Sequence, residues 1–217
     1  MNWRRGGLLA ECLLLFGGIP GLLIVWQLRG GFPFFPVLVA MLALTLLIGW
    51  QATEVRFRQP GNTCPVRPIL LRAAAAGVAL LLLTALLWPE LCFRLLRDRP
   101  RLWVMVVTLY PLLSVAPQEY LFRVFFNQRY RELFGSGHRM RLVNALVFAW
   151  AHAFMLNPVA PLLSLPAGWL LGDTWLKTRS LRAVCLEHAL YGQLVFTIGL
   201  GWFFYNASPH VLSPLAP

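Results

Sequence analysis

Long apolar runs recur along this chain of 217 residues, and they constrain its fold more than any other feature. A helix needs about 20 apolar residues to cross the hydrocarbon core of a bilayer. Backbone groups find no water inside that core, so a spanning segment has to satisfy its own hydrogen bonds. The runs therefore predict an all-α fold, a polytopic membrane helix bundle.

About seven transmembrane spans are expected, in one membrane domain that covers residues 1–217. No internal repeat or low-complexity linker divides the chain. The predicted spans are 7–28, 34–52, 69–92, a fourth from 102 onward through Pro111 and Pro117, 142–156, 158–176 and 181–205.

The composition supports this class and excludes others. Hydrophobic residues make up 59% of the chain and charged residues only 12%, roughly half the charged share of an ordinary soluble domain. A soluble protein cannot cover so much apolar surface with so few charges. The high share of hydrophobic residues also excludes a disordered chain. The four cysteines have no CxxC pair, so neither a disulfide scaffold nor a zinc framework is indicated.

The formal net charge of +11 points to membrane topology rather than to nucleic acid, because the cations lie between the apolar runs. With the N-terminus inside, 13 of the 19 Lys and Arg residues are cytoplasmic and five are outside, while Arg123 is left unassigned. No small-x-small cleavage site follows the first run, so an uncleaved first helix is expected. The arginine cluster at 94–101 falls outside, which leaves open a miscounted span or an interfacial amphipathic helix.

Ionisable residues inside apolar segments are functional-site hypotheses, because each is costly there. Glu119 and Arg123 are spaced i,i+4 after Pro117, so they share one helix face; a plain intrahelical ion pair is the structural alternative. His152 lies deep in the fifth predicted span, four residues after Phe148. A hydrogen-bonded packing histidine is the alternative there.

The third such place is early in the seventh predicted span. His188 shares a helix face with Tyr191 or Gly192. Glu187 lies about 100° away around the helix, so it needs a different partner. Two further acids are read as structural, Glu11 near the start of the first span and Asp173 with Lys177 as its expected i+4 partner.

Together, Glu119, His152 and His188 place one carboxylate and two imidazoles on three helices. The carboxylate can act as general base on water, and the imidazoles can stabilise the oxyanion of peptide hydrolysis. Zinc binding is the second interpretation of one Glu and two His. HExxH is absent and no nearby Cys or third histidine completes a site, so no metal and no cofactor are predicted.

These segments resemble the glutamic intramembrane proteases called the type II CAAX prenyl endopeptidase, ABI or CPBP family, in a bacterial branch. The family pattern is EExxxR, then FxxxH, then HxxxN or HxxxD on three helices. In this chain the corresponding residues, in the same order, run from Gln118 to Arg123, from Phe148 to His152 and from His188 to Gly192.

The resemblance implies a metal-independent intramembrane endopeptidase with a helical protease core at about 69–205. It implies a membrane-associated peptide or protein as substrate, which need not be prenylated, and the bacterial cytoplasmic (inner) membrane as location. Neither the resemblance nor the charge pattern points to nucleic acid as a partner. Carried over by position, the residues are Glu119, His152 and His188 as catalytic, and Gln118, Arg123, Phe148, Gly192 and Gln193 as supporting.

Two positions depart from the family pattern. Gln118 stands where the first Glu is expected, and Gly192, with Gln193 beside it, stands where an amide or carboxylate is expected. Either Glu119 is the base, or the chemistry differs, or the chain is a non-catalytic membrane binding or scaffolding relative. A transporter or channel is a third hypothesis, which predicts internal symmetry that the sequence lacks.

Overall fold

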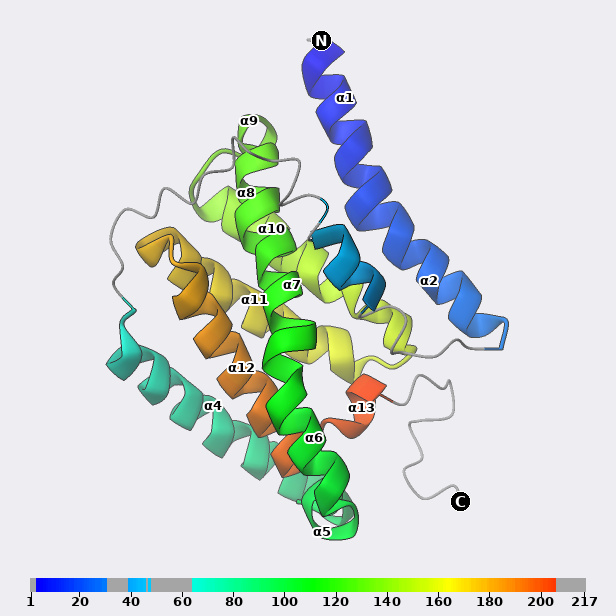
Figure 1. Ribbon diagram of the computed structural model, residues 1–217, viewed down its shortest axis with the longest axis vertical. Helices are drawn as coiled ribbons and strands as arrows, with labels where there is room; N and C mark the ends of the chain where they lie inside the picture. Colours follow the sequence, from blue (N-terminus) through cyan, green and yellow to red (C-terminus); the bar gives the residue numbers. More distant parts are fainter. Residues whose placement is uncertain (1–2, 31–38, 46, 48–63, 206–217) are drawn as a thin grey trace. The chain divides into compact units, whose positions relative to one another are not determined.

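The computed structural model describes residues 3–30, 39–45, 47 and 64–205. Every regular element within these ranges is a helix (Figure 1), which confirms the all-α prediction. Most of the second predicted span, 34–52, lies outside the described residues, as does most of the basic segment that follows it.

Three helical stretches among the described residues are long and apolar enough to cross a membrane: Trp3–Leu28, Val66–Leu87 and Pro100–Arg129. They correspond to the first, third and fourth predicted spans. Further helices cover the fifth, sixth and seventh: α10 (His138–Ala151), α11 (Val159–Thr178) and α12 (Leu181–Ile198). The total of about seven spans stays a prediction.

The chain divides into two compact units, each built from separate stretches of sequence. The first, unit 1, contains Met1–Pro33, Leu121–Leu176 and Phe203–Pro217; the second, unit 2, contains Phe34–Tyr120 and Lys177–Trp202.

Unit 1 is built around the first helical stretch, α10 and most of α11. Phe16 contacts Phe126 and Tyr130 edge-on, with ring centroids 5.0 and 5.9 Å apart. Gly168 on α11 lets that helix approach α10, since a Cβ there would lie 3.1 Å from Phe148. The unit also contains α1 (Trp3–Cys12), η1 (Leu13–Gly18), α2 (Ile19–Leu28), α8 (Phe126–Arg129), α9 (Arg131–Phe134), η5 (Ala153–Met155) and most of η4 (Tyr120–Phe125) and α13 (Trp202–Tyr205).

Unit 2 has α12 packed against both α4 (Val66–Leu87) and α6 (Pro100–Tyr110). Helices α4 and α12 run parallel, since Arg72 pairs with Glu187 and Gly77 lies against Leu194 further along both helices. Helix α6 runs antiparallel to α12: Trp103 bonds Thr197 near one end, and Tyr110 bonds His188 near the other. The remaining elements are η2 (Pro89–Leu91), α5 (Arg94–Asp98), η3 (Pro111–Val115) and α7 (Ala116–Glu119).

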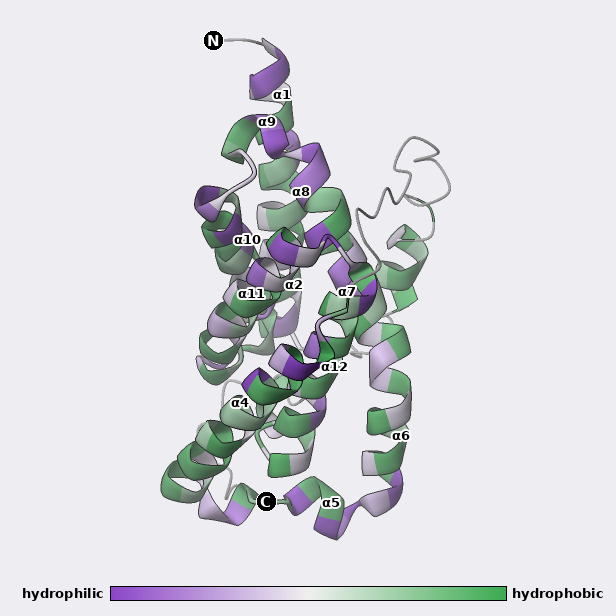
Figure 2. Cartoon of the chain, turned by 90° about the vertical axis from the view of Figure 1, so that its left-hand side faces the viewer, coloured by the Kyte–Doolittle hydropathy of each residue, from purple (hydrophilic) through white to green (hydrophobic). Residues whose placement is uncertain are grey.

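The outer face of α4 is strongly apolar. Leu71, Val78, Leu82 and Leu86 are each more than 60% exposed, and Figure 2 shows hydrophobic residues along most of α4 and α6. Water-soluble proteins rarely leave apolar patches of this extent uncovered. This face is therefore suited to lipid, as expected of an integral membrane protein.

The arginine cluster at 94–101 belongs to the connection between α4 and α6. Arg94 and Arg97 lie on the five-residue helix α5 and pair with Asp98 at 3.6 and 2.9 Å. The Arg94 guanidinium also lies 5.1 Å from the ring centroid of Trp202. A five-residue helix is about 7.5 Å long, too short to cross a bilayer. The cluster thus lies on a short connecting helix and not inside a spanning one.

Candidate active site

One helical stretch of unit 2, α6–η3–α7, carries the first group of candidate residues. Pro111 opens the π-helical segment η3 inside this stretch. Proline has no backbone N–H, so Val107 loses the α-helical donor that residue 111 would otherwise supply. The Val107 carbonyl accepts a hydrogen bond from the Gln193 side chain of α12 at 3.3 Å instead. Gln193 thus ties α12 to the proline break.

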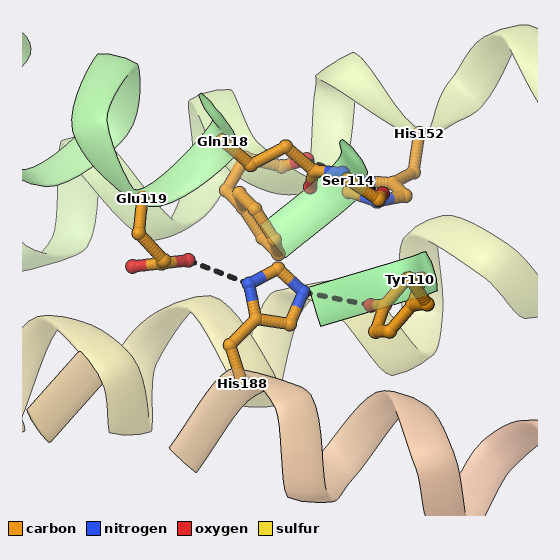
Figure 3. A network of polar contacts seen from close by, with 7 residues as sticks. Tyr110, Ser114, Gln118, Glu119, His152 and His188 are labelled. Carbon is orange, nitrogen blue, oxygen red and sulfur yellow. Dashed lines mark hydrogen bonds and ion pairs between the residues drawn. The ribbon is translucent and has the colours of Figure 1, made fainter. Parts of the chain in front are cut away.

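Glu119 and His188 form a buried pair. Glu119 Oε1 lies 2.7 Å from His188 Nδ1, and the Glu119 side chain has no solvent exposure (Figure 3). On the other side of the ring, His188 Nε2 lies 3.0 Å from the Tyr110 hydroxyl. An ionised carboxylate can only accept, so a neutral His188 donates from Nδ1 to Glu119 and accepts at Nε2 from Tyr110.

Gln118 is held within its own helix. Its Nε2 donates to Ser114 Oγ at 2.7 Å (Figure 3). Its Oε1 is enclosed and accepts no hydrogen bond from the residues that the structure describes. A neutral amide cannot take a proton from water, so Gln118 cannot replace the first acid of the family pattern as a base.

A second buried acid lies beside this pair but belongs to a different network. Glu187 Oε1 is 3.2 Å from the guanidinium of Arg72 on α4 and accepts a hydrogen bond from the Tyr191 hydroxyl at 2.7 Å. This separation of Glu187 from His188 confirms what the helical spacing predicts. The network anchors α4 to α12 and keeps the charge of Glu187 paired.

The other three candidate residues lie together in unit 1. Arg123 is fully buried, and its guanidinium carbon lies 5.2 Å from the ring centroid of Phe148. His152 Nδ1 lies 2.8 Å from the Phe148 carbonyl oxygen. A carbonyl can only accept, so Nδ1 of His152 carries a hydrogen.

The structure thus groups the candidates in two sets. Unit 2 holds Gln118, Glu119, His188, Gly192 and Gln193, while unit 1 holds Arg123, Phe148 and His152. Glu119 and His188 are brought into direct contact. That His152 completes the same site stays a prediction.

Tyr110 and Ser114 were missed by the sequence reasoning, although a signal was present. Tyr110, Ser114 and Gln118 are spaced by four residues in an otherwise apolar run. That spacing predicts three polar side chains on one helix face, and Figure 3 shows Gln118 bonded to Ser114 and Tyr110 bonded to His188.

Two of the structural acids have partners that sequence spacing could not indicate. Asp173 accepts a hydrogen bond from Arg141 on α10 at 2.6 Å, and Glu11 accepts one from Arg129 Nε at 2.8 Å. No group of three or more His, Cys, Asp or Glu residues placed to hold a metal ion occurs in the part of the chain that the structure describes.

Residues 100–194 match the family model described as Rce1-like, type II CAAX prenyl endopeptidase. This segment is Rce1-like. The match contains all three motifs, from Gln118 through His152 to Gly192, and it confirms the family resemblance. Rce1-like proteins are a family of membrane proteases. No curated protein and no solved structure matches the chain.

Proposed function

We propose that this protein is an intramembrane endopeptidase that cleaves a membrane-associated peptide or protein, with Glu119 as its base and without a metal. The observation that carries the proposal is the buried contact of Glu119 with His188 inside the Rce1-like segment. A carboxylate is costly in an apolar helix, and this one is held in place by an imidazole rather than by solvent.

The proposed reaction starts with Glu119 taking a proton from a water molecule. The water oxygen then bonds to the scissile carbonyl carbon, and the carbonyl oxygen becomes an oxyanion. When this intermediate collapses, the C–N bond breaks and the proton on Glu119 passes to the leaving amine. Gln118 cannot carry the proton in either step, which leaves Glu119 as the base in this part of the helix.

His152 and His188 are proposed to stabilise the oxyanion. Each gives its Nδ1 hydrogen to another group, Phe148 O for His152 and Glu119 for His188. Donation from Nε2 therefore requires the doubly protonated ring. The neutral His188 of the structure has to gain this proton and give up the hydrogen bond that its Nε2 accepts from Tyr110 before it can donate to the oxyanion. A cationic donor in a water-poor site is a strong stabiliser of developing negative charge.

We further propose that the protein lies in the bacterial cytoplasmic membrane with its N-terminus inside and about seven spans. The parallel arrangement of α4 and α12 is consistent with this count, because two parallel spans must have an odd number of other spans between them along the chain. The stretch Pro100–Arg129, α10 and α11 supply three.

Cleavage by the purified full-length protein in liposomes tests the proposal. Two probe peptides are compared, a farnesylated peptide with a C-terminal CAAX sequence and an unprenylated peptide anchored by one apolar helix. We expect cleavage of at least one probe, with the same rate in the presence of 1,10-phenanthroline. Inhibition by the chelator that zinc reverses would contradict the metal-free mechanism. Binding of both probes without cleavage of either would instead support the non-catalytic relative.

A further inference from the structure

We propose that Tyr110 is a positioning residue for His188, and that it takes the place of the side chain that the family pattern expects at position 192. The inference rests on the proposed function, because it assigns a role within the same site. It explains why a glycine is present where an amide or carboxylate is expected.

The first step is the space beside Gly192. A Cβ atom built on Gly192 would lie 2.5 Å from both the Cζ and the hydroxyl oxygen of Tyr110. Real Cβ atoms essentially never come so close to another heavy atom. The Tyr110 ring is also fixed from another side, edge-on against Phe196 at 5.4 Å between ring centroids. The phenol therefore occupies the volume that a side chain at 192 would fill.

The second step is the bond that the phenol makes. Residue 192 lies one helical turn after His188, so a side chain there would face the imidazole. Tyr110 reaches the same imidazole from α6 and bonds its Nε2 at 3.0 Å. The neighbouring amide of Gln193 is directed elsewhere, to the Val107 carbonyl. Tyr110 is thus the polar group that meets Nε2 from this side.

The third step is the effect on His188. A hydroxyl that donates to Nε2 favours the neutral tautomer with hydrogen on Nδ1, the nitrogen that faces Glu119. Without the hydroxyl, the Nε2–H tautomer loses one of its two disadvantages; the other is that Nδ1 in that form has no hydrogen to offer the Glu119 carboxylate. Tyr110 therefore acts on Glu119 through His188.

The test uses the full-length protein in lipid nanodiscs or liposomes, with two readouts for each variant. One is the ¹⁵N chemical shift of each His188 ring nitrogen, which reports the tautomer and the bond at Nε2; a His188→Gln variant assigns the signals. The other is kcat and KM on whichever probe peptide the wild type cleaves. The variants are Tyr110→Phe, Gly192→Asn and the double variant Tyr110→Ala/Gly192→Asn. Tyr191→Phe is the matched control, since it removes a buried phenol bonded to Glu187 instead.

We expect Tyr110→Phe to shift the Nε2 signal and to lower kcat about tenfold, with KM changed less than about twofold, since a hydrogen bond of this kind contributes up to about 1.5 kcal/mol. Gly192→Asn alone is expected to be at least as impaired, because its side chain meets the Tyr110 ring. The double variant should regain most of the lost kcat, because the new amide has the vacated space and can reach His188. Tyr191→Phe should leave the His188 signals unchanged.

Wild-type kcat together with an unchanged Nε2 signal in Tyr110→Phe would overturn the proposal. A double variant no better than Gly192→Asn alone would overturn the exchange of Tyr110 for a side chain at 192. If the wild type cleaves neither probe, the proposed function fails, and the ¹⁵N signals then decide the role of Tyr110 by themselves.

Discussion

At the scale of single residues, Arg123 illustrates how a fixed positive charge is accommodated in an apolar segment. Arginine stays protonated in nearly any protein setting, so it cannot act as acid or base. Arg123 is fully buried and stacks its guanidinium over the ring of Phe148, whose carbonyl also binds His152. We therefore propose that Arg123 holds the Phe148–His152 side of unit 1 in place.

Replacing Arg123 by Lys should impair the protein although the charge is kept. The planar stack over Phe148 and the forked donor geometry are lost, which we expect to cost about 1 kcal/mol or more in stability and to reduce cleavage. Thermal unfolding of the detergent-purified variant and its rate on the cleaved probe measure both effects. Arg139→Lys is the control, because Arg139 is exposed on α10. Wild-type stability and turnover in Arg123→Lys would contradict this role.

The sequence predicted those candidate residues that stand out because a polar group is costly in an apolar helix. It missed the residues whose role depends on a partner in another helix. Glu119 and His188 are polar groups in apolar helices, and the structure puts them in contact. The bond of Tyr110 to His188 depends on the pairing of α6 with α12. That pairing is a tertiary contact between residues 78 positions apart, which the spacing of the motifs does not contain.

At the scale of elements, hydropathy and length predicted the helices well but not their internal breaks. The stretches Trp3–Leu28 and Pro100–Arg129 follow the apolar runs. Each contains π-helical turns, at η1, η3 and η4 (Tyr120–Phe125). Such turns do not change the apolar pattern, so they are invisible to it, yet they shift which side chains face a neighbour and are frequent at functional sites.

The end of α12 depends on Gly199. This residue has a φ of 125°, which side-chain-bearing residues rarely adopt, and a Cβ there would collide with the Leu91 carbonyl oxygen. We expect Gly199→Ala to lower the stability of the protein by about 2 kcal/mol or more. Gly21→Ala in α2 is the control: its Cβ meets nothing within 4 Å, and alanine favours a helix interior. Unfolding midpoints in detergent compare the two, and equal midpoints would contradict the assigned role of Gly199.

At the scale of the whole molecule, the sequence predicted an integral membrane protein but not how its helices group into two units. Low charge and long apolar runs are properties of the sequence, and they stay the same however the spans are arranged. The groupings depend on local fits, such as Gly77 against Leu194 and Gly168 against Phe148. Such contacts between two packed helices cannot be predicted from the apolar run of either helix alone.

The topology can be tested with reporter fusions. With the N-terminus inside, a fusion at Asp98 should lie outside the cytoplasm and a fusion at Ser136 inside, because Pro100–Arg129 crosses between them. Alkaline phosphatase should therefore be active at Asp98 and inactive at Ser136, and green fluorescent protein should give the opposite result. The inverse pattern at both positions would reverse the orientation, and the same side for both would exclude Pro100–Arg129 as a span.

The central claim is that Glu119 is the base, and the rate of peptide cleavage by Glu119→Gln in liposomes tests it most directly. The matched control is Glu187→Gln, which neutralises the other fully buried carboxylate on the Arg72 side of α12. Rates are compared per amount of folded protein on the probe that the wild type cleaves. We predict that Glu119→Gln folds but loses at least about 10²-fold in rate, because an amide cannot take a proton from water, whereas Glu187→Gln cleaves at a rate close to wild type. Wild-type cleavage by Glu119→Gln would contradict the claim.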